Sequence, residues 1–325
     1  MERREVVFGM LTLGTAGMPR RLSAQSAPRT YRIGVLSLFL PPGRFVTFFK
    51  SVGDLGYVEG RNLVIEYAFA DGQAGRLPGL AADLVAKKVD LIIAPYNLEV
   101  EAAMHATSTI PIVMQYVGIP VESGYIASLA HPGGNVTGMA NAPPEVAGKA
   151  VEVLRDALPH IADVAVLYDS AYPDQNPYWP ELVRAFKVLG IRPTYLPVTG
   201  RVGLDAGLDT IAAKRLDALY VVSYRTTFVH QARVIEFAAR RRLPAIYTGR
   251  AAILEGGLMS YAPDYDVVRQ RAATFVDRIF KGANAADLPV EQPTKYSLFI
   301  NLKTAKALGL KLPQSFLMRA DEVIE

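Results

Sequence analysis

From residue 31 onward, short apolar runs alternate with segments in which apolar residues recur every three or four positions. Runs of the first kind predict buried strands, and segments of the second kind predict amphipathic helices. Their alternation is typical of βα units on a parallel sheet. The first half of the chain predicts strands at 31–38, 62–69, 90–94 and 111–117 and helices at 45–55, 77–88, 98–107 and 122–129.

The same pattern begins again after residue 140. It predicts helices at 146–158, 179–189, 204–214 and 229–241 and strands at 163–168, 193–198, 217–223 and 244–247. The remaining C-terminal portion is too short for a third domain, so we expect its elements to complete both sheets through several crossovers. The predicted fold is α/β, with two doubly wound, Rossmann-like lobes and a ligand cleft where strand ends converge. We expect the first lobe to hold residues 30–140 and 261–286, and the second to hold 141–260 and 287–325.

The first 27 residues predict a cleavable export signal. Arg3 and Arg4 precede a short apolar run, Val6–Met18, and Ala24 offers a small residue for cleavage. The paired arginines and the moderate hydrophobicity favour twin-arginine export. The run of 13 residues is shorter than the roughly 20 that span a bilayer, so an uncleaved membrane anchor is disfavoured. We therefore expect a periplasmic location.

Composition excludes several classes of chemistry. The chain has 325 residues, 50% of them hydrophobic, which is enough for a large core. It has no cysteine, so disulfides, thiolate catalysis and cysteine-ligated metals are excluded. Four arginines and two glutamates before residue 22 supply +2 of the net charge of +4, which leaves +2 for the rest. That charge is too small to indicate a nucleic-acid partner.

Motifs for nucleotides, metals and hydrolysis are not found. No G-x-G-x-x-G follows the first predicted strand. In SLAHPGGNVTGM, residues 128–139, two glycines have the separation of a phosphate-binding loop, but Met139 and Ala140 stand where Lys and Ser or Thr are required. The four histidines lack ligand spacing, and no G-x-S-x-G elbow occurs. We expect no catalytic residue, no metal and no cofactor.

Tyrosines gather at the ends of predicted strands, where ligands of open α/β sheets bind. A tyrosine ring offers an apolar face and one hydroxyl, which suits a small organic solute, although any one of these rings can equally cap the core. Short polar residues and two arginines lie in the adjacent loops, where an arginine can pair with a carboxylate or remain a solvated charge. The candidate ligand-binding residues are Ser37, Tyr96, Asn97, Tyr116, Tyr168, Ser223, Tyr224, Arg225, Thr248, Arg250 and Tyr261, with Tyr247 at a similar strand end.

Four long segments resemble the ABC-transporter substrate-binding proteins of the tryptophan/tyrosine-type family. They are LGYVEGRNLVIEYAFADGQAGRLPGLAADLVAKKVDLIIA (55–94), IASLAHPGGNVTGM (126–139), EGGLMSYAPD (255–264) and DLPVEQPTKYSLFINLKTAKALGLKLP (287–313). The resemblance implies a type I periplasmic binding fold that closes over one solute. It also implies delivery of that solute to a membrane permease with its ATPase. Characterised relatives bind aromatic amino acids.

The chain departs from the family pattern in three loops at the expected pocket. Residues 95–99 replace a loop with Gly and Thr-Pro, Ile119 replaces an Asp, and residues 223–228 replace a loop with Asp-Pro. The lost acid is a natural partner for an amino group, and Glu99 is a possible replacement.

These features predict the periplasmic solute-binding component of an ABC importer, not an enzyme. We expect it to capture an amino-acid-like or aromatic carboxylate by closure of two lobes, as a monomer and without nucleic acid. An exported α/β enzyme and a solute sensor on the same scaffold remain alternatives. Gly133, Gly134 and Gly138 are expected to form part of the hinge, at the start of the first crossover.

Overall fold

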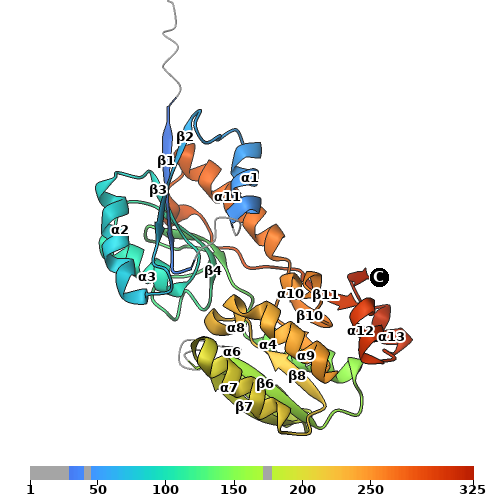
Figure 1. Ribbon diagram of the computed structural model, residues 1–325. Helices are drawn as coiled ribbons and strands as arrows, with labels where there is room; N and C mark the ends of the chain where they lie inside the picture. Colours follow the sequence, from blue (N-terminus) through green and yellow to red (C-terminus); the bar gives the residue numbers. More distant parts are fainter. Residues whose placement is uncertain (1–28, 40–44, 171–177) are drawn as a thin grey trace, which may run out of the picture.

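The computed structural model describes residues 29–39, 45–170 and 178–325, which form two α/β lobes (Figure 1). The first lobe holds a five-stranded sheet in the order β2-β1-β3-β4-β5, and every neighbouring pair is parallel. Most of these strands are buried on both faces, which explains why they read as continuous apolar runs. The strands are β1 (Tyr31–Ser37), β2 (Leu63–Phe69), β3 (Leu91–Ala94), β4 (Ile112–Val117) and β5 (Val136–Ala140).

Helices cover both faces of the first sheet. On one face, α1 (Val46–Asp54) packs beside α11 (Tyr265–Phe280), although the two are far apart in sequence (Figure 1). On the other face lie α2 (Leu77–Ala86), which follows the short η2 (Ala74–Arg76), and α3 (Asn97–Ala106). The β1 side chains alternate accordingly, since Ile33 and Val35 pack against α1 and α11 while Leu36 packs against α2 and α3.

The second lobe holds a seven-stranded sheet in the order β12-β11-β10-β9-β8-β6-β7. Its pairs are parallel except for β10 with β11. The strands are β6 (Asp163–Asp169), β7 (Arg192–Val198), β8 (Ala218–Val221), β9 (Ala245–Tyr247), β10 (Met259–Pro263), β11 (Tyr296–Asn301) and β12 (Glu322–Ile324).

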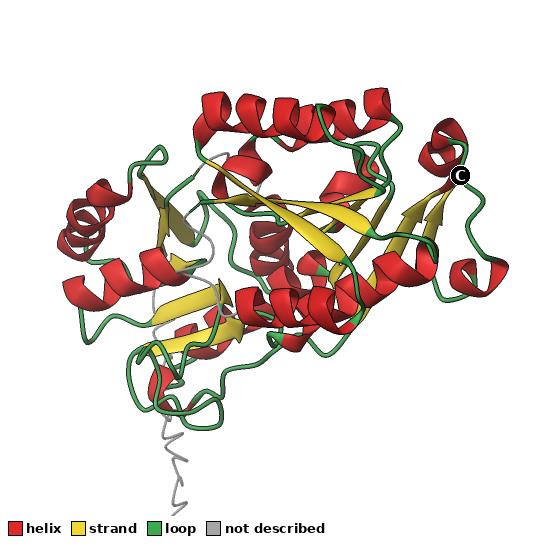
Figure 2. Ribbon diagram, turned by 90° about the horizontal axis from the view of Figure 1, so that it is seen from below, coloured by secondary structure: helices red, strands yellow, loops and turns green. Residues whose placement is uncertain are grey.

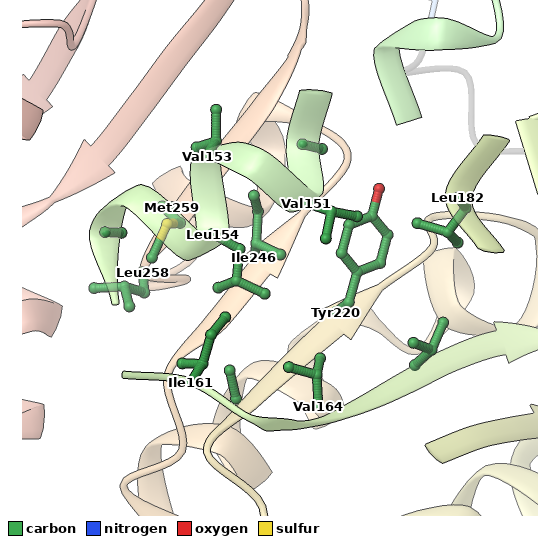
Figure 3. Packing of buried hydrophobic residues seen from close by; sticks show 14 of the residues in the cluster. Val151, Val153, Leu154, Ile161, Val164, Leu182, Tyr220, Ile246, Leu258 and Met259 are labelled. Carbon is green, nitrogen blue, oxygen red and sulfur yellow. The ribbon is translucent and has the colours of Figure 1, made fainter. Parts of the chain in front are cut away.

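Helices also flank this second sheet (Figure 2). One core joins the sheet to α4 (Glu145–Ala157) and α6 (Tyr178–Val188), and Figure 3 shows α4 residues packed over Tyr220 and Ile246. The opposite core contains residues of α7 (Gly200–Ala212), α9 (Gln231–Arg241) and α10 (Arg250–Leu254). The remaining helices of this lobe are α8 (Arg225–Val229), α12 (Leu302–Leu308) and α13 (Gln314–Leu317).

The described chain passes between the sheets at three places. The first crossover follows β5 at residues 141–144, and the second joins β10 to α11 through Asp264, whose side chain caps that helix. The third follows η3 (Ala285–Asp287) and leads to β11. There the Ala140 N–H donates to the Glu291 carbonyl oxygen at 2.8 Å, so the third crossover runs beside the end of β5. The crossovers therefore join the carboxyl ends of β5 and β10.

The predicted elements agree with the structure except at three places. The helix expected at 122–129 is wrong, because this segment forms turns in which Gly124 has a φ angle of 73°, and Ile119 just before it has a φ angle of 40°. The helix expected at 229–241 is confirmed as one at 231–241, but the pattern does not predict the short helix at 225–229 that precedes it. Gly133 and Gly134 precede β5, so a whole strand separates them from the first crossover and the expectation that they begin it is wrong.

The sheets also place two segments differently from the expected division into lobes. Tyr261 lies in β10 and so belongs to the second sheet, whereas Leu288 and Val290 pack in the cores of the first lobe. No helix in the described ranges is long and apolar enough to cross a membrane. The expected export signal, residues 1–27, lies outside the residues that the structure describes.

Candidate ligand site

A small recess lies at the carboxyl ends of β1, β3 and β4, the edge of a parallel sheet where ligands bind. Its free volume of about 10 Å³ is room for about one water molecule. A larger solute therefore needs the walls of the recess to move. The lining residues are Ser37, Phe45, Pro95, Tyr96, Gln115, Tyr116 and Arg269.

Three tyrosines form a continuous aromatic wall beside this recess. The rings of Tyr96 and Tyr116 have centroids 5.4 Å apart, and Tyr265 meets Tyr116 edge-on at 5.3 Å. Both distances are typical of favourable ring pairs. Because Tyr265 begins α11, the wall extends from β3 across β4 to a helix that returns to the first lobe from the second.

A bulge in β4 allows two consecutive residues to line the recess. Met114 pairs with Gly138 and Val117 pairs with Ala140, so two residues of β4 lie opposite Met139 alone. Successive side chains of a regular strand point to opposite faces, and a bulge redirects them. Gln115 and Tyr116 can therefore both reach the recess.

Arg269 brings a positive charge to the recess. Its Nη1 donates to the Asp266 carboxylate at 2.8 Å, and its guanidinium carbon lies 5.7 Å from the centre of the Tyr116 ring. Burial lowers the pKa of Arg269, but the neighbouring Tyr116, Asp266 and Tyr96 outweigh that effect and raise it above its usual value. The side chain therefore stays charged at every physiological pH.

Two further polar side chains, those of Gln115 and Ser37, lie beside Arg269 in the recess. Gln115 is 2% exposed, and its Nε2 has no hydrogen-bond partner in the described part of the chain. Ser37 donates its hydroxyl proton to the Phe39 carbonyl oxygen at 2.9 Å. Among the lining residues that the structure describes, none carries a carboxylate.

The sequence profile of the ABC transporter substrate binding protein family matches residues 45–324. The chain belongs to this family. It is 26% identical over 264 residues to a tyrosine-binding protein from Clostridioides difficile, which covers 81% of this chain and 76% of that one. Members of the family bind a small molecule and act with a transporter permease.

Solved structures confirm the type I periplasmic binding protein fold. An ABC domain from Streptococcus pneumoniae in complex with L-Trp has a TM-score of 0.81 and 23% identity, and covers 91% of this chain and 100% of that chain. A conserved domain protein from Vibrio cholerae has a TM-score of 0.82 and 24% identity with the same coverage.

Three residues predicted from the sequence, Ser37, Tyr96 and Tyr116, meet in the recess of this substrate-binding protein. Asn97 does not line it. The Asn97 amide donates to the Gly118 carbonyl oxygen and its oxygen accepts the Gly118 N–H, both at 3.1 Å. Asn97 thus joins the start of α3 to the loop after β4.

The predicted residues of the second lobe lie outside the recess. Tyr168, at the end of β6, contacts Trp179 with ring centroids 4.5 Å apart. The Ser223 N–H donates to Thr248 Oγ1 at 2.9 Å, which joins two neighbouring strand ends. The Tyr261 ring lies 6.3 Å from that of Tyr296. Their roles in this family member stay predictions.

The other predicted residues lie at the start of α8, in the core of the second lobe, or in an ion pair. Tyr224 caps the N-terminus of α8, its N–H donates to Thr227 Oγ1 at 2.9 Å, and Arg225 begins that helix. Tyr247 is 2% exposed in the core, so its placement at the cleft is wrong. Arg250 is also engaged elsewhere, because its Nε and Nη2 donate to both carboxylate oxygens of Glu322 at 3.0 and 2.6 Å.

Sequence reasoning missed four lining residues, Phe45, Pro95, Gln115 and Arg269. Gln115 carries a usable signal, because it is the single polar residue of the buried run IVMQYV. Arg269 carries none, because only the packing of α11 beside α1 shows which sheet it reaches. Glu99 is 2% exposed and accepts the Leu38 N–H at 2.8 Å, so it holds the loop after β1 and does not line the recess.

Proposed function

We propose that this protein is the exported solute-binding component of an ABC importer. It captures an amino-acid-like or aromatic carboxylate between its lobes and delivers it to a membrane permease that works with an ATPase. The observation that carries the proposal is the recess in which Tyr96 and Tyr116 lie beside the charged Arg269. Flat apolar rings with one nearby charge suit a small aromatic acid.

The relatives support the same class of solute. One relative is a tyrosine-binding protein, and one neighbouring structure holds L-Trp. The paired Arg3 and Arg4 before a short apolar run support twin-arginine export, signal cleavage and a periplasmic location. We propose a monomer with no nucleic-acid partner and no enzymatic activity.

Closure of the two lobes links solute binding to delivery. The crossovers follow the carboxyl ends of β5 and β10, which supports our proposal that the candidate residues of the second lobe form the opposite wall of one cleft. A solute that contacts both walls binds the closed state more tightly and shifts the population toward it. The permease then distinguishes loaded from empty protein by shape.

A thermal-shift screen over amino acids, aromatic acids, nucleosides and sugars tests this function. We expect saturable stabilisation by an acid of the proposed class, and mass spectrometry should recover that acid unchanged. Chemical conversion of the solute would favour an enzyme. If no solute stabilises the protein, the proposal fails. Neighbouring genes for a permease and an ATPase distinguish import from sensing.

Single substitutions test the location of the site. Tyr96→Ala should weaken binding of the best solute by about tenfold or more, because it removes a buried aromatic face. Tyr67→Ala is the matched control, since Tyr67 is 40% exposed on β2 and does not line the recess. Tyr224→Ala tests the second lobe. Unchanged affinity in both Tyr96→Ala and Tyr224→Ala would show that the site is misplaced.

A further inference from the structure

We infer that Arg269 and Gln115 form an anion subsite that binds the carboxylate of the solute from the first lobe. This inference rests on the proposed function and makes it more specific. It assigns the charge-binding role to a residue of α11, in place of Arg225 or Arg250. It also identifies the solute as an acid, as opposed to an amine or an uncharged sugar.

The guanidinium of Arg269 is positioned for a second anionic partner. Its side chain is 20% exposed, and Nη1 is its one hydrogen-bonding nitrogen among the residues that the structure describes. Its partner Asp266 is 49% exposed and also accepts a hydrogen bond from Thr47 Oγ1 at 3.1 Å. An arginine presents its donors as a planar fork that matches the two oxygens of a carboxylate. The Nε and Nη2 groups can supply such a pair of donors.

Gln115 supplies an independent observation that points to an acceptor on the solute. Gln115 is only 2% exposed, and it lines the same recess as Arg269. Its Nε2 donor has no partner within the described ranges. Buried donors are nearly always paired in folded proteins, so an unpaired one facing a recess calls for an acceptor from the ligand.

The surroundings exclude a cationic group at this subsite. The described lining residues include one charged side chain, that of Arg269. Glu99, the acid that the sequence analysis offers as a partner for an amino group, accepts the Leu38 N–H, and Asp266 is paired with Arg269. A solute amine placed here would meet a positive charge and an N–H donor, whereas a carboxylate would meet complementary groups. Any amino group of the solute therefore faces away from Arg269.

Calorimetric titration of the full chain with three probes that share one ring tests the inference. L-tyrosine and 3-(4-hydroxyphenyl)propionate carry the carboxylate, and tyramine lacks it. We expect the two acids to bind and tyramine to bind at least about 100-fold more weakly, as a lost charged hydrogen-bond pair implies. Tyramine binding as tight as that of tyrosine would overturn the inference and leave solute binding intact. Binding of none of the three would also overturn it, and the broad thermal-shift screen then decides whether solute binding itself fails.

Two variants assign the effect to the named residues. Arg269→Gln should weaken tyrosine binding by about 10- to 100-fold, while Arg278→Gln, an exposed position on the same helix, should leave it unchanged. Equal affinity of Arg269→Gln and wild type would overturn the role of Arg269. The melting temperature without solute shows whether Arg269→Gln is folded.

Gln115→Met keeps the test decisive if Arg269→Gln does not fold. This substitution conserves volume and removes a donor that has no partner, so the melting temperature of the empty protein should stay equal or rise. Affinity for both acids should fall by about threefold to tenfold. A lower melting temperature with unchanged affinity would mean that Gln115 is structural, and would overturn its place in the subsite.

Discussion

Gly138 lies directly against the backbone of Met114. A Cβ atom on Gly138 would be 2.3 Å from the Met114 carbonyl oxygen and 2.8 Å from its nitrogen, and the Gly138 φ angle is 122°. Only glycine tolerates both conditions. The pair marks the start of the β4 bulge that brings Gln115 and Tyr116 to the recess. The third glycine of SLAHPGGNVTGM therefore shapes the candidate site and has no phosphate to bind.

Gly138→Ala should destabilise the protein by about 2–4 kcal/mol, because the new methyl group collides with backbone and the φ angle is strained. Urea unfolding measures this change, and a titration with the best solute should show weaker binding because the bulge shifts. Gly134→Ala is the control. A Cβ atom there has no neighbour within 4 Å, and its φ is not positive. Similar stability of the two variants would contradict the close approach of Gly138.

Arg250→Ala should leave solute affinity unchanged, because Arg250 is bound to Glu322 on β12 and lies 5.5 Å from the Phe299 ring. The two charged side chains are 34% and 38% exposed, so the loss of stability should be about 1 kcal/mol or less. Urea unfolding of the single variants and of the double variant with Glu322→Ala measures their coupling. A large loss of affinity in Arg250→Ala would return this residue to the ligand site.

The stabilising contribution of Tyr57 to folding should be lost in alkali. Burial and the hydrogen bond to Asp277 raise the pKa of Tyr57 from 10.0 to about 12. Between these values the unfolded phenol is ionised while the folded one is still protonated. Folding stability therefore falls as pH rises through this window, whereas below it the contribution of Tyr57 is fully present and does not change with pH. Tyr57→Phe should be less stable than wild type by about 1 kcal/mol at pH 8.

The deficit of Tyr57→Phe should shrink as pH rises toward 12, because the variant has no phenol to ionise. Urea midpoints at a series of pH values from 8 upward check this. A deficit that stays constant across the series would contradict the raised pKa of Tyr57.

The sequence predicts the fold well because its strands are buried on both faces. Runs such as LIIA in β3 and ALYV in β8 read as strands without reference to any partner. The helix expected at 122–129 fails because apolar spacing does not show that Gly124 adopts a positive φ. Local patterns thus predict elements where burial is regular, and fail where one backbone angle decides.

The candidate site is only partly predictable for a different reason. Tyr96 follows β3 and Tyr116 lies near the end of β4, so the rule for strand ends finds both. Gln115 reaches the recess through a bulge that depends on pairing with β5, and Arg269 through a helix that crosses back from the second lobe. Both features depend on contacts between distant segments. The same rule wrongly selects Arg250, which follows β9. Its hydrogen bond to Glu322 in the C-terminal strand cannot be read from the local sequence.

Trp179, the single tryptophan, should report solute binding. Its ring lies 4.5 Å from Tyr168 at the end of β6 and 5.1 Å from Tyr195. The neighbouring Tyr178 donates its hydroxyl to the carbonyl oxygen of Ala142 in the first crossover. The start of α6 therefore contacts the first crossover, a segment that we expect to bend when the lobes close on a solute.

We expect the emission of Trp179 to change on titration with the best solute and to saturate at the concentration found by calorimetry. Trp179→Phe should abolish the signal and leave the affinity unchanged, because Trp179 does not line the recess. Tyr168→Leu should alter the signal, since it removes the ring that Trp179 contacts. If saturating solute leaves wild-type emission unchanged, the start of α6 does not respond to closure, and the hinge motion lies elsewhere in the crossovers.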